Sequence, residues 1–260
     1  MKETEILIQD LDIGYGDFLL MRDLHFSVSK GDIFIIMGES GCGKSTLLKV
    51  MIGLKKPSAG RVFYGDRSFW EADPDEQGRI MRRFGVLYQN GALWTSMTLA
   101  ENIALPLEQY TSLSRGDIRD MVSLKLAFVG LAGFEDFYPS ELSGGMKKRA
   151  GLARAMALDP DILFFDEPSA GLDPVNARTI DDLILQIRDS FGSTFVVVTH
   201  ELASIFAIGS NAVFLDADTR TMTAWGDPKK LLSESDDPKV RRFLTRGEDS
   251  ALKAGRENGP

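Results

Sequence analysis

A glycine-rich segment of eight residues, Gly38–Ser45, constrains this chain more than any other part of its sequence. It reads Gly-Glu-Ser-Gly-Cys-Gly-Lys-Ser and fits the phosphate-loop pattern at every position. The apolar run Ile33–Met37 precedes it, and a helical pattern of leucine and methionine follows it. Such a turn between a buried strand and a helix directs main-chain N–H groups at phosphate oxygens. The segment therefore predicts a nucleoside triphosphate site, and a glycine-rich turn without a ligand is the weaker interpretation.

Three residues of this segment have distinct expected roles. Lys44 would reach the β- and γ-phosphates, and the Ser45 hydroxyl would bind Mg²⁺. Cys42 stands at a variable position of the pattern, so we interpret it as a small filler and not as a nucleophile.

Apolar runs elsewhere predict an α/β fold with a mostly parallel core sheet. Ile162–Asp166 and Thr194–Thr199 are two more buried strands, joined by segments of helix length. Near the N-terminus, Ile6–Gln9 and Leu24–Val28 alternate apolar and polar residues on either side of a Gly14-Tyr15-Gly16 turn. This alternation predicts an N-terminal antiparallel β subdomain.

The middle of the chain has a different pattern. From about residue 96 to about residue 158 there are helical periodicity and capping signals, such as Ser114 with Asp117, without a convincing strand. We expect a helical subdomain inserted into the sheet domain. Further on, strand-like runs at 212–215 and 222–225 precede a short amphipathic stretch, Val240–Leu244. The expected organisation is one domain over residues 1–246 and a polar, disordered tail at 247–260.

A pair of carboxylates ends the second buried strand. Asp166 would be delivered to the magnesium ion, and Glu167 would polarise an attacking water molecule. Adjacent carboxylates at a strand end can also be a solvated turn or a helix cap. Taken alone, that second interpretation is favoured.

Four further elements bear on the choice. Ser143–Gly145 precedes a cationic helix and forms a second helix start suited to phosphate, although a flexible linker is the usual explanation of such a sequence. Gln89 follows a strand-like run and His200 follows the third buried strand, where they could be a surface polar residue and a helix-start histidine. Asp173 could simply cap a helix before Pro174.

Together and in this order, these elements resemble the ATP-binding subunit of ABC transporters, from about Ile6 to about Trp225. The resemblance implies a P-loop NTPase with a RecA-like core. It implies that Lys44, Glu167 and His200 are catalytic and that Ser45, Gln89 and Asp166 hold Mg²⁺. The residues that it implies contact ATP are Tyr15, Gly38, Glu39, Ser40, Gly41, Cys42, Gly43, Lys44, Ser45, Thr46, Gln89, Ser143, Gly144, Gly145 and Asp173. It also implies that two copies sandwich two ATP molecules, each site combining one phosphate loop with the other copy's Ser143–Gly145.

A narrower resemblance connects the chain with the ATPases of Mla/MCE-type lipid transporters. Its residues are Met146–Arg149, Gln89–Trp94, Glu101–Leu107 and Asp237–Leu244. This resemblance implies phospholipid as the substrate, moved through an integral membrane permease, and allows an MCE lipid-binding protein and an accessory cytoplasmic subunit as further partners. We expect the permease to dock beside Gln89, with Trp94 and Met97 as contact candidates, whereas ordinary packing explains Trp94 equally well. The Val240–Leu244 stretch could dock on the second copy or cover its own chain.

Composition limits the alternatives. The net charge of −8 and the pI of about 4.9 argue against nucleic acid as a partner. One cysteine makes no internal disulfide, the N-terminus has no secretory pattern, and no apolar run approaches the ~20 residues that cross a bilayer. These features lead us to expect a chain in a reducing cytosol, and the resemblance implies a peripheral position on the cytoplasmic side of the inner membrane. The alternatives that stay open are another ABC transporter, for amino acids, metals, drugs or lipoproteins, and a soluble ABC ATPase without a transport role.

Overall fold

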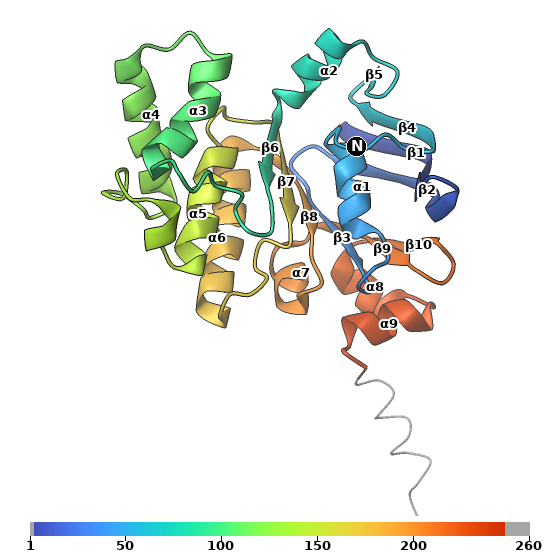
Figure 1. The fold of residues 1–260 in the computed structure, drawn as a ribbon. Helices are drawn as coiled ribbons and strands as arrows, with labels where there is room; N and C mark the ends of the chain where they lie inside the picture. The colour runs from blue at the N-terminus through green and yellow to red at the C-terminus, as the bar shows by residue number, and fades with distance from the viewer. Residues whose placement is uncertain (1–2, 248–260) are drawn as a thin grey trace, which may run out of the picture. The chain divides into compact units, whose positions relative to one another are not determined.

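The computed structural model describes residues 3–247 of the chain. These residues form two compact units, one of residues 3–72 with 198–247 and one of residues 73–197 (Figure 1). The expected disordered tail at 247–260 lies, apart from Gly247, outside the described residues. No helix within residues 3–247 is both long enough and apolar enough to cross a membrane.

Alternating apolar and polar residues build an antiparallel sheet in the first unit, with the strand order β2-β1-β4-β5. Its strands are β1 (Thr4–Tyr15), β2 (Phe18–Ser29), β4 (Ala59–Tyr64) and β5 (Arg67–Ser68). In β1, Ile6 and Ile8 are fully buried while Gln9 is only half-buried, as the period of two requires. The predicted N-terminal antiparallel pair is confirmed. Strands β4 and β5 were not anticipated.

The strand that leads into the phosphate loop lies beside a strand from late in the chain, which in turn pairs with a second late strand. β3 (Ile33–Gly38) pairs in parallel with β9 (Asn211–Asp216), and β9 pairs antiparallel with β10 (Thr221–Gly226). All residues of β3 are buried, which accounts for its continuous apolar run. The helices of this unit are α1 (Lys44–Met51), α7 (Leu202–Ile208), α8 (Pro228–Glu234) and α9 (Pro238–Leu244).

The second unit combines parallel strands with most of the helices. β6 (Phe84–Leu87) pairs in parallel with β7 (Ile162–Asp166), which neighbours β8 (Thr194–Val198). Its helices are α2 (Pro74–Met81), α3 (Leu99–Tyr110), α4 (Arg115–Phe128), the short 3₁₀ turn η1 (Pro139–Glu141), α5 (Gly144–Ala155) and α6 (Pro174–Phe191). Residues 96–158, all of them described, contain α3, α4, η1 and α5 joined by loops, and no strand, whereas the helical subdomain with these bounds stays a prediction. The α/β fold with parallel strand pairs is confirmed, whereas helix α2 was not anticipated.

Capping explains where two of the helices begin. Ser114 and Asp117 form the predicted capping box of α4, in which each side chain accepts a hydrogen bond from the other residue's main-chain N–H. Thr98 and Glu101 do the same for α3. These local signals fix the helix starts before any packing is considered.

Helix α9 packs on its own chain. Val240 is fully buried, Leu244 is nearly so, and the Phe243 ring meets the Phe214 ring of β9 edge-on at 5.3 Å. Of the two docking sites expected for this amphipathic stretch, the structure therefore shows contact with its own unit.

Candidate functional site

The phosphate loop closes around the side chain of Lys44. This lysine is buried, and its ammonium donates hydrogen bonds to the carbonyl oxygens of Gly38 and Glu39, both at 2.9 Å. The loop thus holds the Lys44 ammonium at the start of α1, where main-chain N–H groups also favour binding of an anion. Loop and lysine together fit the phosphates of a nucleotide.

Two other features of the loop agree with its sequence. Gly38 has a φ of 146°, and a Cβ atom there would lie 2.4 Å from the Leu215 carbonyl oxygen, so only glycine fits this position. Cys42 is fully buried, and burial raises the pKa of its thiol although Lys44 opposes this. A protonated, enclosed thiol is a poor nucleophile, in keeping with the role of a filler.

Tyr15 lies against the start of α1. Its hydroxyl is 3.3 Å from the Thr46 hydroxyl, and the Lys55 ammonium lies over its ring at 4.0 Å from the centroid. The ring is about half exposed, at 53% for the whole residue. The residue predicted to stack on adenine therefore adjoins the loop predicted to bind phosphate.

His200 follows β8 in the same unit as the phosphate loop. Thr199, directly before it, donates its main-chain N–H to the Ile36 carbonyl oxygen at 3.3 Å. His200 itself is exposed, and its Nε2 atom lies 3.7 Å from the Glu201 carboxylate. The histidine thus sits beside the strand that ends in the loop.

In the second unit, the parallel pairing of β6 and β7 brings two predicted metal ligands to one edge of the sheet. Leu87 pairs with Phe165, so Gln89 and Asp166 both emerge at the carboxyl ends of these strands. Tyr88, between Leu87 and Gln89, has its pKa raised by burial, and the charge of Asp166 adds to this rise. Neighbouring strand ends therefore carry the amide and the carboxylate.

The donor set fits magnesium better than other metals. Ser45, Gln89 and Asp166 offer a hydroxyl, an amide and a carboxylate oxygen, the hard ligands that Mg²⁺ prefers together with phosphate oxygens. Within residues 3–247 there is no group of three or more His, Cys, Asp and Glu side chains that could hold a metal ion alone. That Ser45, Gln89 and Asp166 act together on one ion stays a prediction from the sequence.

Glu167 has an unusual backbone conformation. Its φ is +51°, in the left-handed region that residues other than glycine seldom adopt. Its carbonyl oxygen accepts hydrogen bonds from the Ala170 N–H at 3.2 Å and from the Lys148 ammonium at 3.3 Å. A strained residue at a strand end, held by several bonds, is typical of a functional position.

Ser143 and Asp173 both cap helices. Ser143 accepts a hydrogen bond from the Met146 N–H at 3.3 Å and so starts α5. Asp173 accepts from the N–H groups of Val175 and Asn176 and starts α6, and bonds from the Asn176 side chain and main chain lower the pKa of its carboxyl. The capping interpretation of Asp173 is thus correct for this structure, and its predicted contact with nucleotide stays a prediction.

Sequence reasoning missed two cations of α5. Lys148 is buried and reaches the turn that begins at Glu167, and Arg154 donates to the carbonyl oxygens of Gly91 and Ala92 in the loop after Gln89. Burial lowers the pKa of both side chains. Lys148 belongs to the Met146–Arg149 stretch that carries the lipid-transporter resemblance, but helical spacing resembles a solvated face and did not indicate the contacts of either cation.

Trp94 is exposed at 59%, but its backbone is fixed. Asn102 accepts from its N–H at 2.8 Å and donates to its carbonyl oxygen at 3.0 Å. The indole borders a cavity of about 230 Å³, which Leu105, Tyr110 and Arg154 also line.

Comparison with known proteins decides the family. The sequence profile described as "ABC transporter" matches residues 21–170, more than half of the chain. The chain belongs to the ABC transporter family. The match contains the phosphate loop, Gln89, Ser143–Gly145 and the Asp166–Glu167 pair.

Two similar proteins of this family have names that state different transported substrates. It is 37% identical, over 97% of its own length and 95% of the relative's, to the "intermembrane phospholipid transport system ATP-binding protein MlaF" of Haemophilus influenzae. It is 39% identical, over 93% of its length, to the "Probable ribonucleotide transport ATP-binding protein mkl" of Mycobacterium tuberculosis. The chain spans 66% of the length of that mycobacterial relative.

A solved structure agrees with this ABC assignment. A dimeric ATP-binding cassette in a post-hydrolysis state, bound to ADP and phosphate, matches with a TM-score of 0.76 and 27% identity. The match covers 85% of this chain and 98% of that cassette. The predicted fold is therefore that of ABC cassettes.

Proposed function

We propose that this protein is the ATP-binding and ATP-hydrolysing subunit of an ABC transporter that moves phospholipid. The observation that carries the proposal is the phosphate loop closed around Lys44 in a chain of the ABC family. Residues 1–246 act as one ATPase domain, with a helical subdomain at about 96–158. Lys44 and His200 stabilise charge on the phosphates, and Glu167 orients the attacking water. Bound Mg²⁺ neutralises phosphate charge and is held by Ser45, Gln89 and Asp166.

The functional unit of the proposal contains two copies of the chain. Each helix start at Ser143–Gly145 faces the γ-phosphate of the ATP bound by the other copy, and Asp173 contacts the same nucleotide. The dimeric cassette with ADP and phosphate supports this arrangement. A single chain contains each element once, so hydrolysis requires association.

Phospholipid is the proposed cargo because the MlaF relative matches over nearly the whole of both chains. A membrane permease provides the path, docked near the exposed Trp94, and the ATPase acts at the cytoplasmic face of the inner membrane. An MCE lipid-binding protein and an accessory cytoplasmic subunit are further proposed partners. Ribonucleotide is the second candidate cargo, which the name of the mycobacterial relative favours.

The test uses the tagged full chain, recovered from native membranes in mild detergent with its associated proteins and returned to liposomes. We expect a multi-span permease among the partners, and transfer of a fluorescent phospholipid that requires ATP and Mg²⁺ and is lost in Glu167→Gln. Uptake of ribonucleotide without lipid transfer would overturn the proposal that phospholipid is the cargo and would leave the proposed ATP hydrolysis in place. Recovery of soluble partners alone would overturn the transport role, and an intact complex without ATP hydrolysis would overturn the whole proposal.

A further inference from the structure

Lys148 is a cation enclosed by main-chain oxygens. It lies in the second turn of α5, and 6% of its surface is exposed. Its ammonium donates to the Ala170 carbonyl oxygen at 2.6 Å and to the Glu167 carbonyl oxygen at 3.3 Å. Burying an ammonium costs free energy unless such partners replace water, so these two bonds determine where the side chain lies.

The two carbonyl groups belong to one tight turn, which begins at Glu167 and ends at Ala170. The Ala170 N–H donates to the Glu167 carbonyl oxygen at 3.2 Å and closes the turn. Lys148 therefore binds the first and the last carbonyl of the turn, and Glu167 has its positive φ at the first position. A backbone in that region persists only where neighbouring groups hold it.

The neighbouring cation of α5 provides a comparison within the same helix. Arg149 also donates to two main-chain oxygens, those of Val129 at 2.8 Å and Gly130 at 2.9 Å, at the end of α4. Both cations therefore attach α5 to another segment by the same kind of bond. Only Lys148, of these two, reaches the turn that carries Glu167.

We propose that Lys148 is a positioning residue for Glu167, holding the backbone of the Glu167–Ala170 turn so that the carboxylate meets the attacking water. This role rests on the proposed ATP hydrolysis. Because Lys148 belongs to the helix that starts at Ser143–Gly145, the element proposed to engage the second copy's ATP also fixes the glutamate of its own chain. Binding of the second copy's ATP at Ser143–Gly145 and the position of the Glu167 carboxylate are then linked through the Lys148 side chain.

The experiment measures steady-state ATPase kinetics and thermal unfolding of the full chain, recovered with its membrane partners, in four variants and in Glu167→Gln as their reference. Lys148→Met removes the donors at similar length, Lys148→Arg restores donors, and Arg149→Met is the matched control. Positioning predicts that Lys148→Met lowers kcat about tenfold or more, with the KM for ATP within about twofold of wild type. Lys148→Arg recovers most of the rate, and Arg149→Met lowers the melting temperature while kcat stays within about twofold.

The fourth variant combines Lys148→Met with Glu167→Gln. If Lys148 acts through Glu167, the double variant is no slower than Glu167→Gln alone, because the group being positioned has gone. A multiplicative further loss, or an unchanged kcat in Lys148→Met, overturns the inference and leaves the ATPase in place. Should Lys148→Met fail to fold, Lys148→Gln, whose shorter side chain keeps one donor group, takes its place, and a smaller fall in kcat with an unchanged KM for ATP is expected. A wild-type complex that does not hydrolyse ATP overturns the proposed function and this role with it.

Discussion

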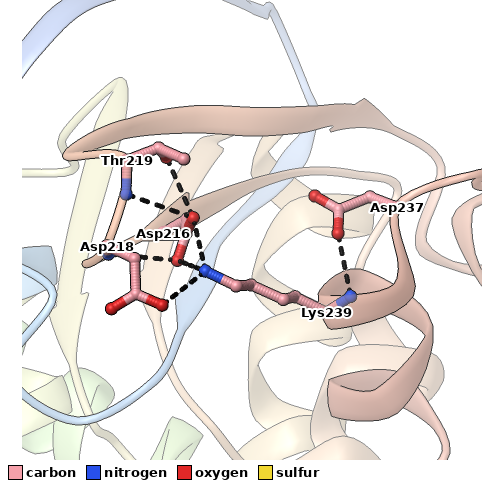
Figure 2. A network of polar contacts seen from close by, with 5 residues as sticks. All are labelled: Asp216, Asp218, Thr219, Asp237 and Lys239. Carbon is pink, nitrogen blue, oxygen red and sulfur yellow. Dashed lines mark hydrogen bonds and ion pairs between the residues drawn. The ribbon is translucent and has the colours of Figure 1, made fainter.

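The Lys239 ammonium binds both carboxylate oxygens of Asp216, at 2.8 and 2.9 Å (Figure 2). Lys239 lies at the start of α9 and Asp216 at the end of β9, so the pair joins the last described helix to the sheet of its unit. Asp218 also accepts from Lys239, and Thr219 donates to Asp216. Burial alone would raise the pKa of Asp216, but these donors lower it to about 2.

Removal of the Lys239 charge should loosen α9. We expect Lys239→Met to lower the free energy of unfolding by about 1–3 kcal/mol, because Asp216 is left buried without its cation. The partial exposure of Lys239 places the effect toward the lower end. Urea unfolding measures it, and Lys230→Met, on an exposed part of α8, is the control expected to change stability by less than about 0.5 kcal/mol. Equal stability of the two variants would contradict the role of the pair.

Acid should weaken the same pair. The pKa of Asp216 is lower in the folded protein, about 2, than the ordinary 3.8, so its contribution is fully present above pH 3.8 and is lost as the pH falls toward 2. The loss amounts to at most about 2.5 kcal/mol. Urea unfolding at several pH values between 5 and 2 should show a steeper loss of stability for wild type than for Lys239→Met. Parallel pH profiles would show that Lys239 does not lower the pKa of Asp216.

Lys44→Ala should weaken ATP binding by about tenfold to a hundredfold, since charge-assisted hydrogen bonds to phosphate contribute about 1.5–3 kcal/mol. Titration of the purified chain with a fluorescent ATP analogue measures the dissociation constant. Lys49→Ala, on the exposed side of the same helix, controls for net charge. An unchanged dissociation constant for Lys44→Ala would remove this lysine from the phosphate site.

Glu167→Gln should keep ATP binding and lose turnover. The amide preserves the shape of the side chain but is a very weak base, so we expect kcat to fall about a hundredfold or more while dimers accumulate with ATP. Phosphate release and size-exclusion chromatography with ATP give the two readouts. A variant with near-native turnover would show that another group orients the water.

Local sequence signals predicted the parts of this fold that depend on neighbours in the chain. The phosphate loop, the buried run Ile162–Asp166 and the capping box at Ser114 are each defined by a few consecutive residues. The bonds from Lys148 to Ala170 and from Lys239 to Asp216 join residues far apart in the sequence. Periodicity contains no information on such pairs, and in helical spacing a cation resembles a solvated face. Both cations belong to stretches that carry the lipid-transporter resemblance, but their contacts were visible only in three dimensions.

Close packing of α5 on the loop after Gln89 leads to the last prediction. A Cβ atom on Gly151 would lie 2.9 Å from the Gly91 carbonyl oxygen and 2.9 Å from a Leu87 methyl group. Because one of these atoms is backbone, Gly151→Ala must displace the loop, at a cost of about 1–3 kcal/mol. In Gly116→Ala, on α4, the nearest atom would be the Ser114 hydroxyl oxygen at 3.6 Å, so the gain of about 0.5–1 kcal/mol typical of alanine in a helix should appear. Chemical unfolding of both variants measures whether the free energy of unfolding falls in Gly151→Ala and rises in Gly116→Ala. Stabilisation by Gly151→Ala would mean that the loop after Gln89 moves aside without cost.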